Sequence, residues 1–363
     1  MAIEKQTAIY PGKPWLDTNG NRIHAHGGSV LFVDDTFYWY GENKEKTVVD
    51  TDIWHWGVRL YSSKDLYNWT DEGIIMMPET EDVEDPMHYT QYMDRPHIIY
   101  NEMTKKFVMW MKIMNNKRMI DQYMVIATAD SIKGPFTKID TFHPLDMSSG
   151  DFDLVVDPKT KKAFIYFDKV HTEMICAELT DDYTNVTGQY SSFWHEPSFT
   201  PLVREAPAFL ERNGKMYLLT SATTGYLPNP TKYAVADNYF GPWEVKGVVH
   251  ENDVENLSFR SQISGIFKHP HKKDLYIALA DRWIYNIPDD IPHDFYEQMV
   301  KKSKKDPNDP FTMDPDVFNR VWNCRAKGVR NISLADYVWL PIEWDGDRPV
   351  IRWYDSWKIE DFE

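Results

Sequence analysis

Short runs of apolar and aromatic residues recur along the chain, and a polar turn precedes each run. The five runs are residues 36–40, 107–111, 163–167, 216–220 and 275–279. Their centres lie about 50 to 70 residues apart, a period typical of stacked or radially repeated units. In four of the five units, a second strand pattern and a turn rich in Asp, Gly and Pro follow, as at residues 129–136 and 236–243. Antiparallel units of this kind predict an all-β fold, a five-bladed β-propeller, with a β-sandwich as the alternative.

The fifth unit is interrupted by residues 284–330. Residues 293–300 have a helical pattern, and residues 301–309 are charged and typical of a loop. Strand patterns return at residues 337–342 and 350–354, which we expect to complete the last blade. We therefore predict a single propeller domain over residues 1–363 with a partly helical insertion in the last blade. The insertion either covers the site or an oligomer face, or is a solvated surface excursion.

Composition excludes several classes of protein. The 363 residues are 42% hydrophobic and 15% aromatic, which is enough for a large core. The net charge of −16 makes nucleic acid and anionic membranes poor partners. No signal segment is visible, so we expect a cytoplasmic protein as written, although a mature secreted form would look the same. Cys176 and Cys324 are too few for a disulfide framework or a zinc site, and both are expected to be buried thiols.

Polar motifs stand about 10 to 15 residues before each aromatic run, where the first strand of each blade is expected to begin. These motifs are His24-Ala25-His26-Gly27-Gly28, Met93-Asp94-Arg95-Pro96-His97, Ser149-Gly150-Asp151-Phe152-Asp153, Val203-Arg204-Glu205-Ala206-Pro207 and Phe259-Arg260-Ser261-Gln262. Because the first strands of a propeller surround a central channel, we expect the five motifs to converge at one end of it. Three of the motifs contribute carboxylates.

Carboxylates that face one another in a pocket fit the hydrolysis of a glycosidic bond, which needs an acid to protonate the leaving oxygen. Glu205 is the candidate general acid, and its alternative role is an ion pair with Arg204 at the end of a strand. A nearby Asp151 would raise the pKa of Glu205 and orient it. Asp153 would point to the same face of a strand as Asp151, although clusters of Asp and Gly are also typical of turns.

Histidines and tryptophans offer further contacts for a sugar. His24, His26 and His97 stand at blade starts, where we expect them to bond to sugar hydroxyls. Calcium prefers oxygen ligands, so these histidines do not indicate a metal site, and no metal and no cofactor are predicted. The loop at residues 44–56 contains Trp54, His55 and Trp56, which suit either a wall against a sugar ring or a packed loop.

In their order along the chain, these motifs resemble family 43 glycoside hydrolases, which are five-bladed β-propellers. The resemblance is strongest to the exo-β-1,3-galactanase branch of that family. The segments that carry it are residues 23–28, 94–101, 149–151, 204–209, 212–221, 261–262 and 281–283. The resemblance implies that Glu205 is the general acid and that Asp151 tunes its pKa and orientation. In most of the family an Asp-Pro pair supplies the general base, and Gly27-Gly28 stand in its place here.

The resemblance also implies roles for Gln262 and Asp94. In the galactanase branch a glutamine at the start of the fifth blade holds the nucleophilic water, as an amide or as its imidic acid tautomer, and Gln262 matches it. Asp94 stands where the branch usually has Glu, as a substrate contact or helper base. Gly150 stands where Arg is frequent. An inverting course implies about 6.5 to 9.5 Å between the acid and the water-holding group. Other residues of these motifs and of the loop are expected to bind substrate: His26, Arg95, Arg204, Trp54, Asp281 and Arg282.

The sequence therefore predicts an exo-acting glycosidase whose partner is an oligosaccharide or polysaccharide. It would release a terminal sugar, galactose, from β-1,3-galactan or arabinogalactan-type glycans. A neighbouring branch of the family keeps two alternatives open, an α-L-arabinofuranosidase and a β-D-galactofuranosidase. A propeller that binds carbohydrate without turnover is the alternative from another class. The oligomeric state is not predicted.

Overall fold

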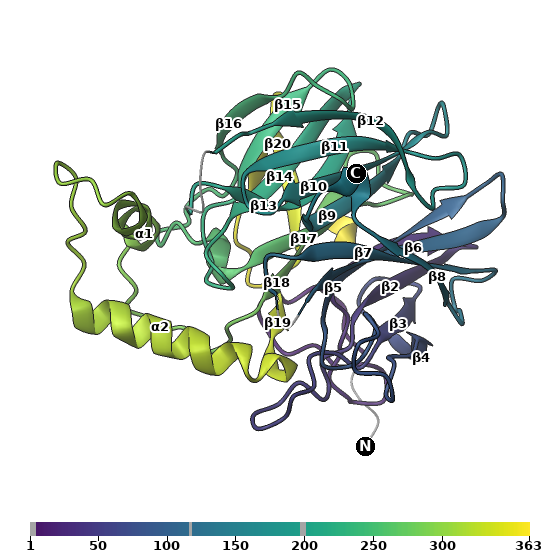
Figure 1. The fold of residues 1–363 in the computed structure, drawn as a ribbon, viewed down its shortest axis with the longest axis horizontal. Helices are drawn as coiled ribbons and strands as arrows, with labels where there is room; N and C mark the ends of the chain where they lie inside the picture. Colours follow the sequence, from purple (N-terminus) through teal and green to yellow (C-terminus); the bar gives the residue numbers. More distant parts are fainter. Residues whose placement is uncertain (1–4, 116–117, 197–200) are drawn as a thin grey trace.

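The strands form five antiparallel sheets arranged around a centre as propeller blades, which confirms the predicted fold class (Figure 1). The structure, a computed structural model, describes residues 5–115, 118–196 and 201–363. In the described residues, no helix is long and apolar enough to cross a membrane.

Each blade takes four consecutive strands of the main path. Blade 1 contains β1 (His26–Val33), β2 (Thr36–Glu42), β3 (Val58–Ser63) and β4 (Thr70–Met76). Blade 2 contains β5 (Tyr92–Asn101), β6 (Lys106–Met114), β7 (Gln122–Ala129) and β8 (Thr137–Phe142). Blade 3 contains β9 (Ser149–Val156), β10 (Ala163–Lys169), β11 (Glu173–Leu179) and β12 (Val186–Phe193). Blade 4 contains β13 (Arg204–Arg212), β14 (Lys215–Ala222), β15 (Lys232–Ala236) and β16 (Glu244–Val248).

Blade 5 is built from two separated parts of the chain. It contains β17 (Gln262–Lys268), β18 (Tyr276–Arg282), β20 (Leu340–Asp345) and β21 (Arg348–Ile351), and the short β19 (Asp336–Tyr337) also pairs with β18. In the part of the chain that the structure describes, four short 3-10 helices lie outside the sheets, at Pro144–Asp146, Ser258–Arg260, Ile332–Leu334 and Ile359–Asp361.

The five aromatic runs of the sequence are the second strands of the blades, β2, β6, β10, β14 and β18. Each of these strands buries at least one aromatic ring between sheets, namely Trp39, Trp110, Tyr166, Tyr217 and Tyr276. The seam between the first and last blades shows how such rings pack. Trp39 of β2 makes an edge-on contact with Trp339, which directly precedes β20, at 4.6 Å between ring centroids. The periodic pattern therefore marks the inter-blade core, where aromatic burial contributes most.

A bulge interrupts the first strand of every blade close to its start. The register passes from His26↔Glu42 to Ser29↔Tyr40 in blade 1, so three steps on β1 oppose two on β2. The same extra residue occurs in the other four blades. In three of the five blades the bulge residue has a positive φ, at Gly27, Arg95 and Ala206. Bulges re-aim the neighbouring side chains, so this repeated irregularity turns the blade-start motifs toward one place.

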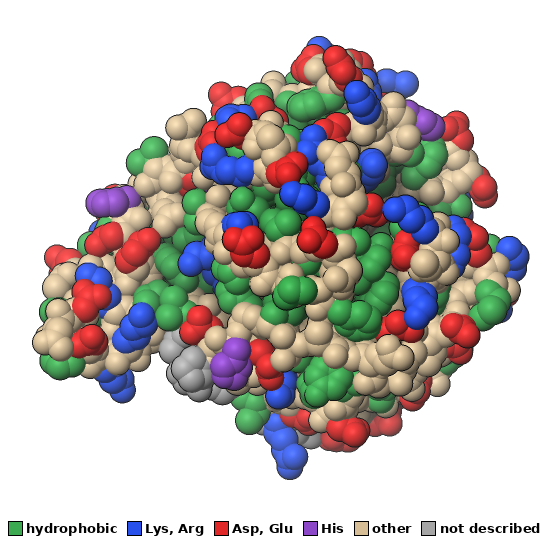
Figure 2. Space-filling model, turned by 90° about the horizontal axis from the view of Figure 1, so that it is seen from above, with side chains coloured by type: hydrophobic (Ala, Val, Ile, Leu, Met, Phe, Trp, Pro, Cys, Tyr) green, Lys and Arg blue, Asp and Glu red, His purple; other side chains and the backbone are tan. Residues whose placement is uncertain are grey.

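Two helices form the insertion between β18 and β19, and they stand out beside the propeller at the left of Figures 1 and 2. The first, α1 (Phe295–Lys304), includes residues that the sequence assigned to a charged loop. The second, α2 (Pro315–Val329), was not predicted. Asp314 caps α2 by accepting a bond from the N–H of Asp316, and Pro315 opens its first turn, both common start signals. Cys324 on α2 is only partly buried, which corrects the expectation of two buried thiols.

Candidate active site

A cavity of about 180 Å³ lies where the blade-start motifs meet. Its wall includes all four predicted catalytic residues, Asp94, Asp151, Glu205 and Gln262, which come from four different blades. The remaining described residues of the wall are Glu42, Arg95, Lys112, Met114, Met119, Gln122, His171, Thr223, Gly225, Tyr226, Trp283 and Arg325. Four carboxyl groups and several cations therefore share one small space.

A larger cavity of about 430 Å³ lies elsewhere, against the N-terminal segment and the turn after β3. Asp17 is the one carboxylate among its described lining residues. The backbone N–H groups of Asn19 and Asn21 donate to the carboxylate of Asp17, which therefore stabilises a local turn. A pair of carboxyl groups is needed for acid and base chemistry, and it occurs in the smaller cavity.

Glu205 lies at the bulge of β13, and its surroundings favour the protonated form of its carboxyl group. Burial, followed by the negative charge of Asp151, raises the pKa of Glu205 to about 7. Its Oε1 accepts a hydrogen bond from Nε2 of Gln262 at 3.1 Å. A carboxyl group with a pKa near the working pH can both hold and release a proton, which is the requirement for a general acid.

Asp151, at the start of β9, is held as an anion by two cations. Nε of Arg95 lies 2.9 Å from one carboxylate oxygen, and Nζ of Lys112 lies 2.8 Å from the other. Burial alone would raise the pKa of Asp151, but the charges of Arg95 and Lys112 overcome it and hold the pKa well below its usual range. The site thus contains one anionic and one readily protonated carboxyl group, the division of states that acid catalysis uses.

Gln262, at the start of β17, makes four hydrogen bonds, the full capacity of a primary amide. Its Nε2 donates to Glu205 and, at 2.8 Å, to Oγ of Ser221. Its Oε1 accepts from Nη2 of Arg95 at 2.8 Å and from Nε1 of Trp283 at 3.1 Å. Guanidinium and indole N–H groups can only donate, so they hold Gln262 as the ordinary amide, whose oxygen accepts.

The contact between Gln262 and Glu205 corrects one expectation from the sequence. An inverting course predicts about 6.5 to 9.5 Å between the acid and the group that holds the water, so that a water fits between them. Glu205 and Gln262 are instead in direct contact at 3.1 Å. The closer approach does not indicate retention, because a retaining enzyme needs a carboxylate nucleophile and Gln262 is an amide.

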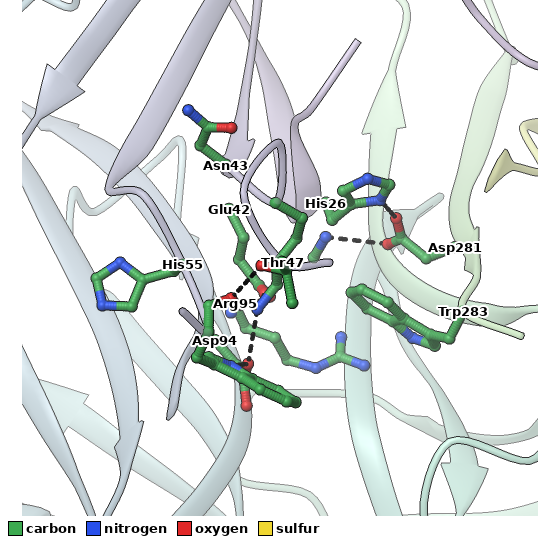
Figure 3. Close-up of polar contacts among 12 residues, drawn as sticks. His26, Glu42, Asn43, Thr47, His55, Asp94, Arg95, Asp281 and Trp283 are labelled. Atoms are coloured by element: carbon green, nitrogen blue, oxygen red, sulfur yellow. Dashed lines mark hydrogen bonds and ion pairs between the residues drawn. The ribbon is translucent and has the colours of Figure 1, made fainter. Parts of the chain in front are cut away.

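Asp94, at the bulge of β5, is bound from two sides. One oxygen accepts from Nε1 of Trp54 at 2.8 Å, and the other lies 3.1 Å from Nζ of Lys112. Figure 3 shows Asp94 beside Arg95, whose guanidinium extends toward Trp283. Trp54 is buried among residues of the insertion and is not one of the described residues of the cavity wall. Of the two roles expected for this loop, packing therefore applies to Trp54.

Glu42 is a wall residue that the sequence analysis missed. An ideal Cβ built on Gly27 would lie 2.3 Å from Oε1 of Glu42, so this carboxyl group fills the space beside Gly27. It accepts from the N–H of Arg95 at 2.8 Å and pairs with Nζ of Lys44 at 2.8 Å. Burial raises the pKa of Glu42 to about 7, against the opposing charge of Lys44.

Blade 3 has the same arrangement. An ideal Cβ on Gly150 would lie 2.2 Å from Oδ1 of Asp168, at the end of β10. Asp168 pairs with Nδ1 of His171 at 2.9 Å, and His171 lines the cavity. Burial alone would lower the pKa of His171, but the hydrogen bond and charge of Asp168 raise it to about 9. At both glycines, a carboxyl group from the second strand takes the space of a side chain on the first.

Most of the predicted substrate contacts lie outside the cavity. Of His26, Arg95, Arg204, Trp54, Asp281 and Arg282, only Arg95 is among the described residues of its wall. Nδ1 of His26 pairs with Asp281 at 2.9 Å in a fully buried contact (Figure 3). Arg204 and Arg282 donate to backbone carbonyls of Pro230 and Phe259. These side chains hold strand ends together, since buried polar groups require partners.

Three other blade-start side chains are also structural. His24 and His97 are buried, and burial lowers the pKa of each to about 3, so both are neutral and neither is among the described wall residues. Asp153 accepts from the N–H of Phe209 at 2.8 Å and so ties β9 to β13. Among the described residues, no three His, Cys, Asp or Glu side chains are grouped so as to hold a metal ion.

The chain carries a family signature along most of its length. The model of glycosyl hydrolases family 43 matches residues 24–286. The chain belongs to glycoside hydrolase family 43. This family of glycosidases was the one indicated by the blade-start motifs, so that prediction is confirmed. No curated protein matches the chain.

Several solved structures of the family superpose on nearly the whole chain. A β-1,3-galactosidase is 29% identical with a TM-score of 0.79, and the match covers 98% of this chain and 65% of that one. A second β-1,3-galactosidase, solved with galactodeoxynojirimycin, is 26% identical with a TM-score of 0.75, over 97% of this chain and 100% of that one. An exo-β-1,3-galactanase from Clostridium thermocellum is 27% identical with a TM-score of 0.73, over 97% and 66%. This family 43 chain therefore spans about two-thirds of the length of some of its relatives.

Proposed function

We propose that this family 43 protein is an exo-acting glycoside hydrolase that releases terminal galactose from β-1,3-linked galactans or arabinogalactan-type glycans. The observation that carries the proposal is the pair formed by Glu205 and Asp151 in the cavity. One carboxyl group has a pKa of about 7, and the other is held ionised by Arg95 and Lys112. Such a pair suits proton donation to a glycosidic oxygen, and a site that only binds sugar does not need it.

The size of the cavity supports an exo mode. Its volume of about 180 Å³ is below the roughly 300 to 1,000 Å³ of pockets that enclose drug-sized ligands. A space of this size suits one terminal sugar ring. The sugar itself is proposed from the relatives, because the three solved structures named above are β-1,3-galactosidases or an exo-β-1,3-galactanase.

In the proposed reaction, Glu205 gives its proton to the oxygen that links the terminal sugar to the rest of the glycan. The bond from the anomeric carbon to that oxygen breaks while a water attacks the opposite face of the ring. Asp151 remains ionised and keeps the pKa of Glu205 high until transfer. The sugar leaves with inverted configuration.

We propose that Glu42 is the general base, which accepts the proton of the attacking water. Its carboxyl group fills the space beside Gly27, which is where the resemblance places the missing first-blade base, and it lines the cavity. With a pKa of about 7, Glu42 can accept a proton at neutral pH. Gln262 already makes its full set of four hydrogen bonds. It therefore positions Glu205 and does not act as the base.

The test is digestion of β-1,3-galactan by the purified protein, with products separated by anion-exchange chromatography over time. An exo-hydrolase releases galactose alone from the first time point, and the Glu205→Gln variant releases at least about a hundred times less. A ladder of oligosaccharides would contradict the exo mode. Binding of galactan without any released sugar would overturn the enzymatic proposal.

A further inference from the structure

Arg325 differs from the other cations of the cavity wall. Arg95 pairs with Asp151, Lys112 pairs with Asp94 and Asp151, and His171 pairs with Asp168. Across residues 5–115, 118–196 and 201–363, no carboxylate lies within ion-pair distance of the guanidinium of Arg325. Arg325 is also the wall residue that comes from the helical insertion.

The position of Arg325 is built into the fold. On α2, Val321, Arg325 and Gly328 share one face of the helix, and the first and last of them are buried. An ideal Cβ on Gly328 would lie 2.9 Å from the side chain of Ile284, so this face packs closely on the chain that follows β18. The insertion therefore holds Arg325 at the cavity and is not a loosely attached excursion.

The guanidinium is fixed by two further contacts. Its Nε donates to the carbonyl of Gly225, and an ideal Cβ on Gly225 would lie 2.8 Å from Nη2. Gly225 has a φ of +57°, a conformation that glycine adopts without strain. The ring of Trp322, one turn back on α2, lies 4.8 Å from the guanidinium carbon. These contacts leave the two terminal amino groups of Arg325 to serve a ligand.

The residue that anchors Arg325 comes from the same blade as the candidate general acid. Glu205 pairs in register with Ser221, and Gly225, which anchors Arg325, follows four residues later in the same blade. The general acid stands next to the leaving-group oxygen, so we infer that the leaving-group sugar lies on the side of blade 4, toward Arg325. An anion there would meet no uncompensated negative charge, because Asp94 and Asp151 are already paired with cations.

We propose that Arg325 recognises an anionic group, the carboxylate of a uronic acid or a sulfate ester, on the sugar next to the scissile bond. An unpaired guanidinium in a partly buried site is costly, and its two parallel N–H groups match the oxygens of a carboxylate or sulfate. Trp322 packs against this guanidinium and against Phe318, which holds the side chain of Arg325 in place. The inference rests on the proposed hydrolase function and narrows its substrate class to acidic glycans.

The experiment compares three matched disaccharides with a nonreducing β-1,3-linked galactose. Their reducing sugar is galactose, galacturonic acid or 6-sulfated galactose. We expect kcat/KM to be about ten times higher, or more, for at least one anionic disaccharide than for the neutral one, and the ratio to fall at high salt. In Arg325→Met the ratio should fall to about one, and Arg325→Lys should keep part of it. The uronate and sulfate arms show which anion is preferred.

The control variant is Arg330→Met, which removes the same charge from an exposed position just after α2. It should keep the full ratio, and an equal loss in both variants would overturn the assignment to Arg325. Binding to a Glu205→Gln background, measured by calorimetry, separates the two proposals. If neutral and anionic disaccharides are cleaved equally and bind equally, the inference about Arg325 is wrong while the hydrolase function stands. If nothing is cleaved but anionic disaccharides bind more tightly through Arg325, the hydrolase proposal is wrong and the anion site stands.

Discussion

Oε1 of Glu42 stands where a side chain at position 27 would begin, since an ideal Cβ on Gly27 would lie 2.3 Å from that oxygen. The two residues face each other across the bulge that separates His26↔Glu42 from Ser29↔Tyr40. A glycine on the first strand and a carboxyl group on the second are therefore one structural feature. The absence of the usual first-blade base is matched by a carboxyl group one strand away.

Substitution of Gly27 tests this dependence. We expect Gly27→Ala to lower the free energy of unfolding by about 2 to 5 kcal/mol, because a left-handed backbone costs about 1 to 2 kcal/mol and displacement of Glu42 leaves buried partners unpaired. Gly346→Ala is the matched control, since Gly346 has the same φ of +63° and no atom near its ideal Cβ. The Gly346→Ala variant should lose only the part of the free energy of unfolding that comes from the left-handed backbone, about 1 to 2 kcal/mol. Equal losses in urea unfolding would show that Glu42 does not depend on Gly27.

Glu42→Gln tests the assignment of the base. Glu42 must be ionised to take the proton of the water, so activity should rise as the pH passes through its pKa of about 7. The variant should lose about 100-fold to 10,000-fold in kcat together with this rising limb of the pH profile. Asp94→Asn is the comparison, and we expect it to raise KM while the rising limb stays. A Glu42→Gln enzyme that keeps the limb would show that another group is the base.

The sequence allowed the architecture and the main carboxylates to be predicted, because both depend on patterns along single strands. The aromatic runs identify the second strands, and counting back from them locates Asp151 and Glu205. The residues that the sequence did not predict lie on the neighbouring strand of each pair. Glu42, Lys112 and Asp168 each come at the end of a second strand, directly or within two residues after an aromatic run, and antiparallel pairing returns that end to the channel mouth.

The substrate contacts were the weaker predictions, because a motif does not reveal which of its side chains faces the channel. His26 precedes Gly27 and Asp281 pairs in register with Gln262, yet the side chains of His26 and Asp281 bond to each other in the interior. A one-residue bulge decides which neighbour points into the cavity, and sequence spacing does not show it. Arg325 was missed for another reason, since its place depends on how an insertion folds back onto a distant loop.

The general acid can be tested with leaving groups of different acidity. Glu205→Gln should lose about 1,000-fold in kcat/KM on β-1,3-galactobiose, whose leaving sugar needs a proton. The loss should be much smaller on dinitrophenyl β-galactoside, whose leaving group departs unprotonated. Glu211→Gln, on the same strand and outside the described cavity wall, is the control and should be near wild type on both substrates. Equal losses of Glu205→Gln on both substrates would contradict its role as the acid.

Asp151 should set the falling limb of the pH profile. Glu205 acts in its protonated form, so activity is lost as the pH rises above its pKa of about 7. The negative charge of Asp151 is a cause of that raised pKa, and Asp151→Asn should lower it and move the falling limb of kcat/KM to lower pH by about one unit or more. Asp153→Asn removes a buried carboxyl group two residues away that is not among the described wall residues. That control should leave the limb in place, and a shift in both variants would point to a general effect of charge.

The anomeric course follows from the state of Gln262. Arg95 and Trp283 both donate to its oxygen, so Gln262 does not serve as a nucleophile, and in the proposed reaction water attacks the sugar directly. Direct attack on a β-galactoside gives α-galactose first, which then equilibrates with the β-anomer. Proton NMR during the first minutes of hydrolysis should therefore show the α-anomeric signal growing ahead of the β-signal. A β-signal that appears first would mean a covalent intermediate on one of the carboxylates, with Glu42 and Asp94 as the groups to label.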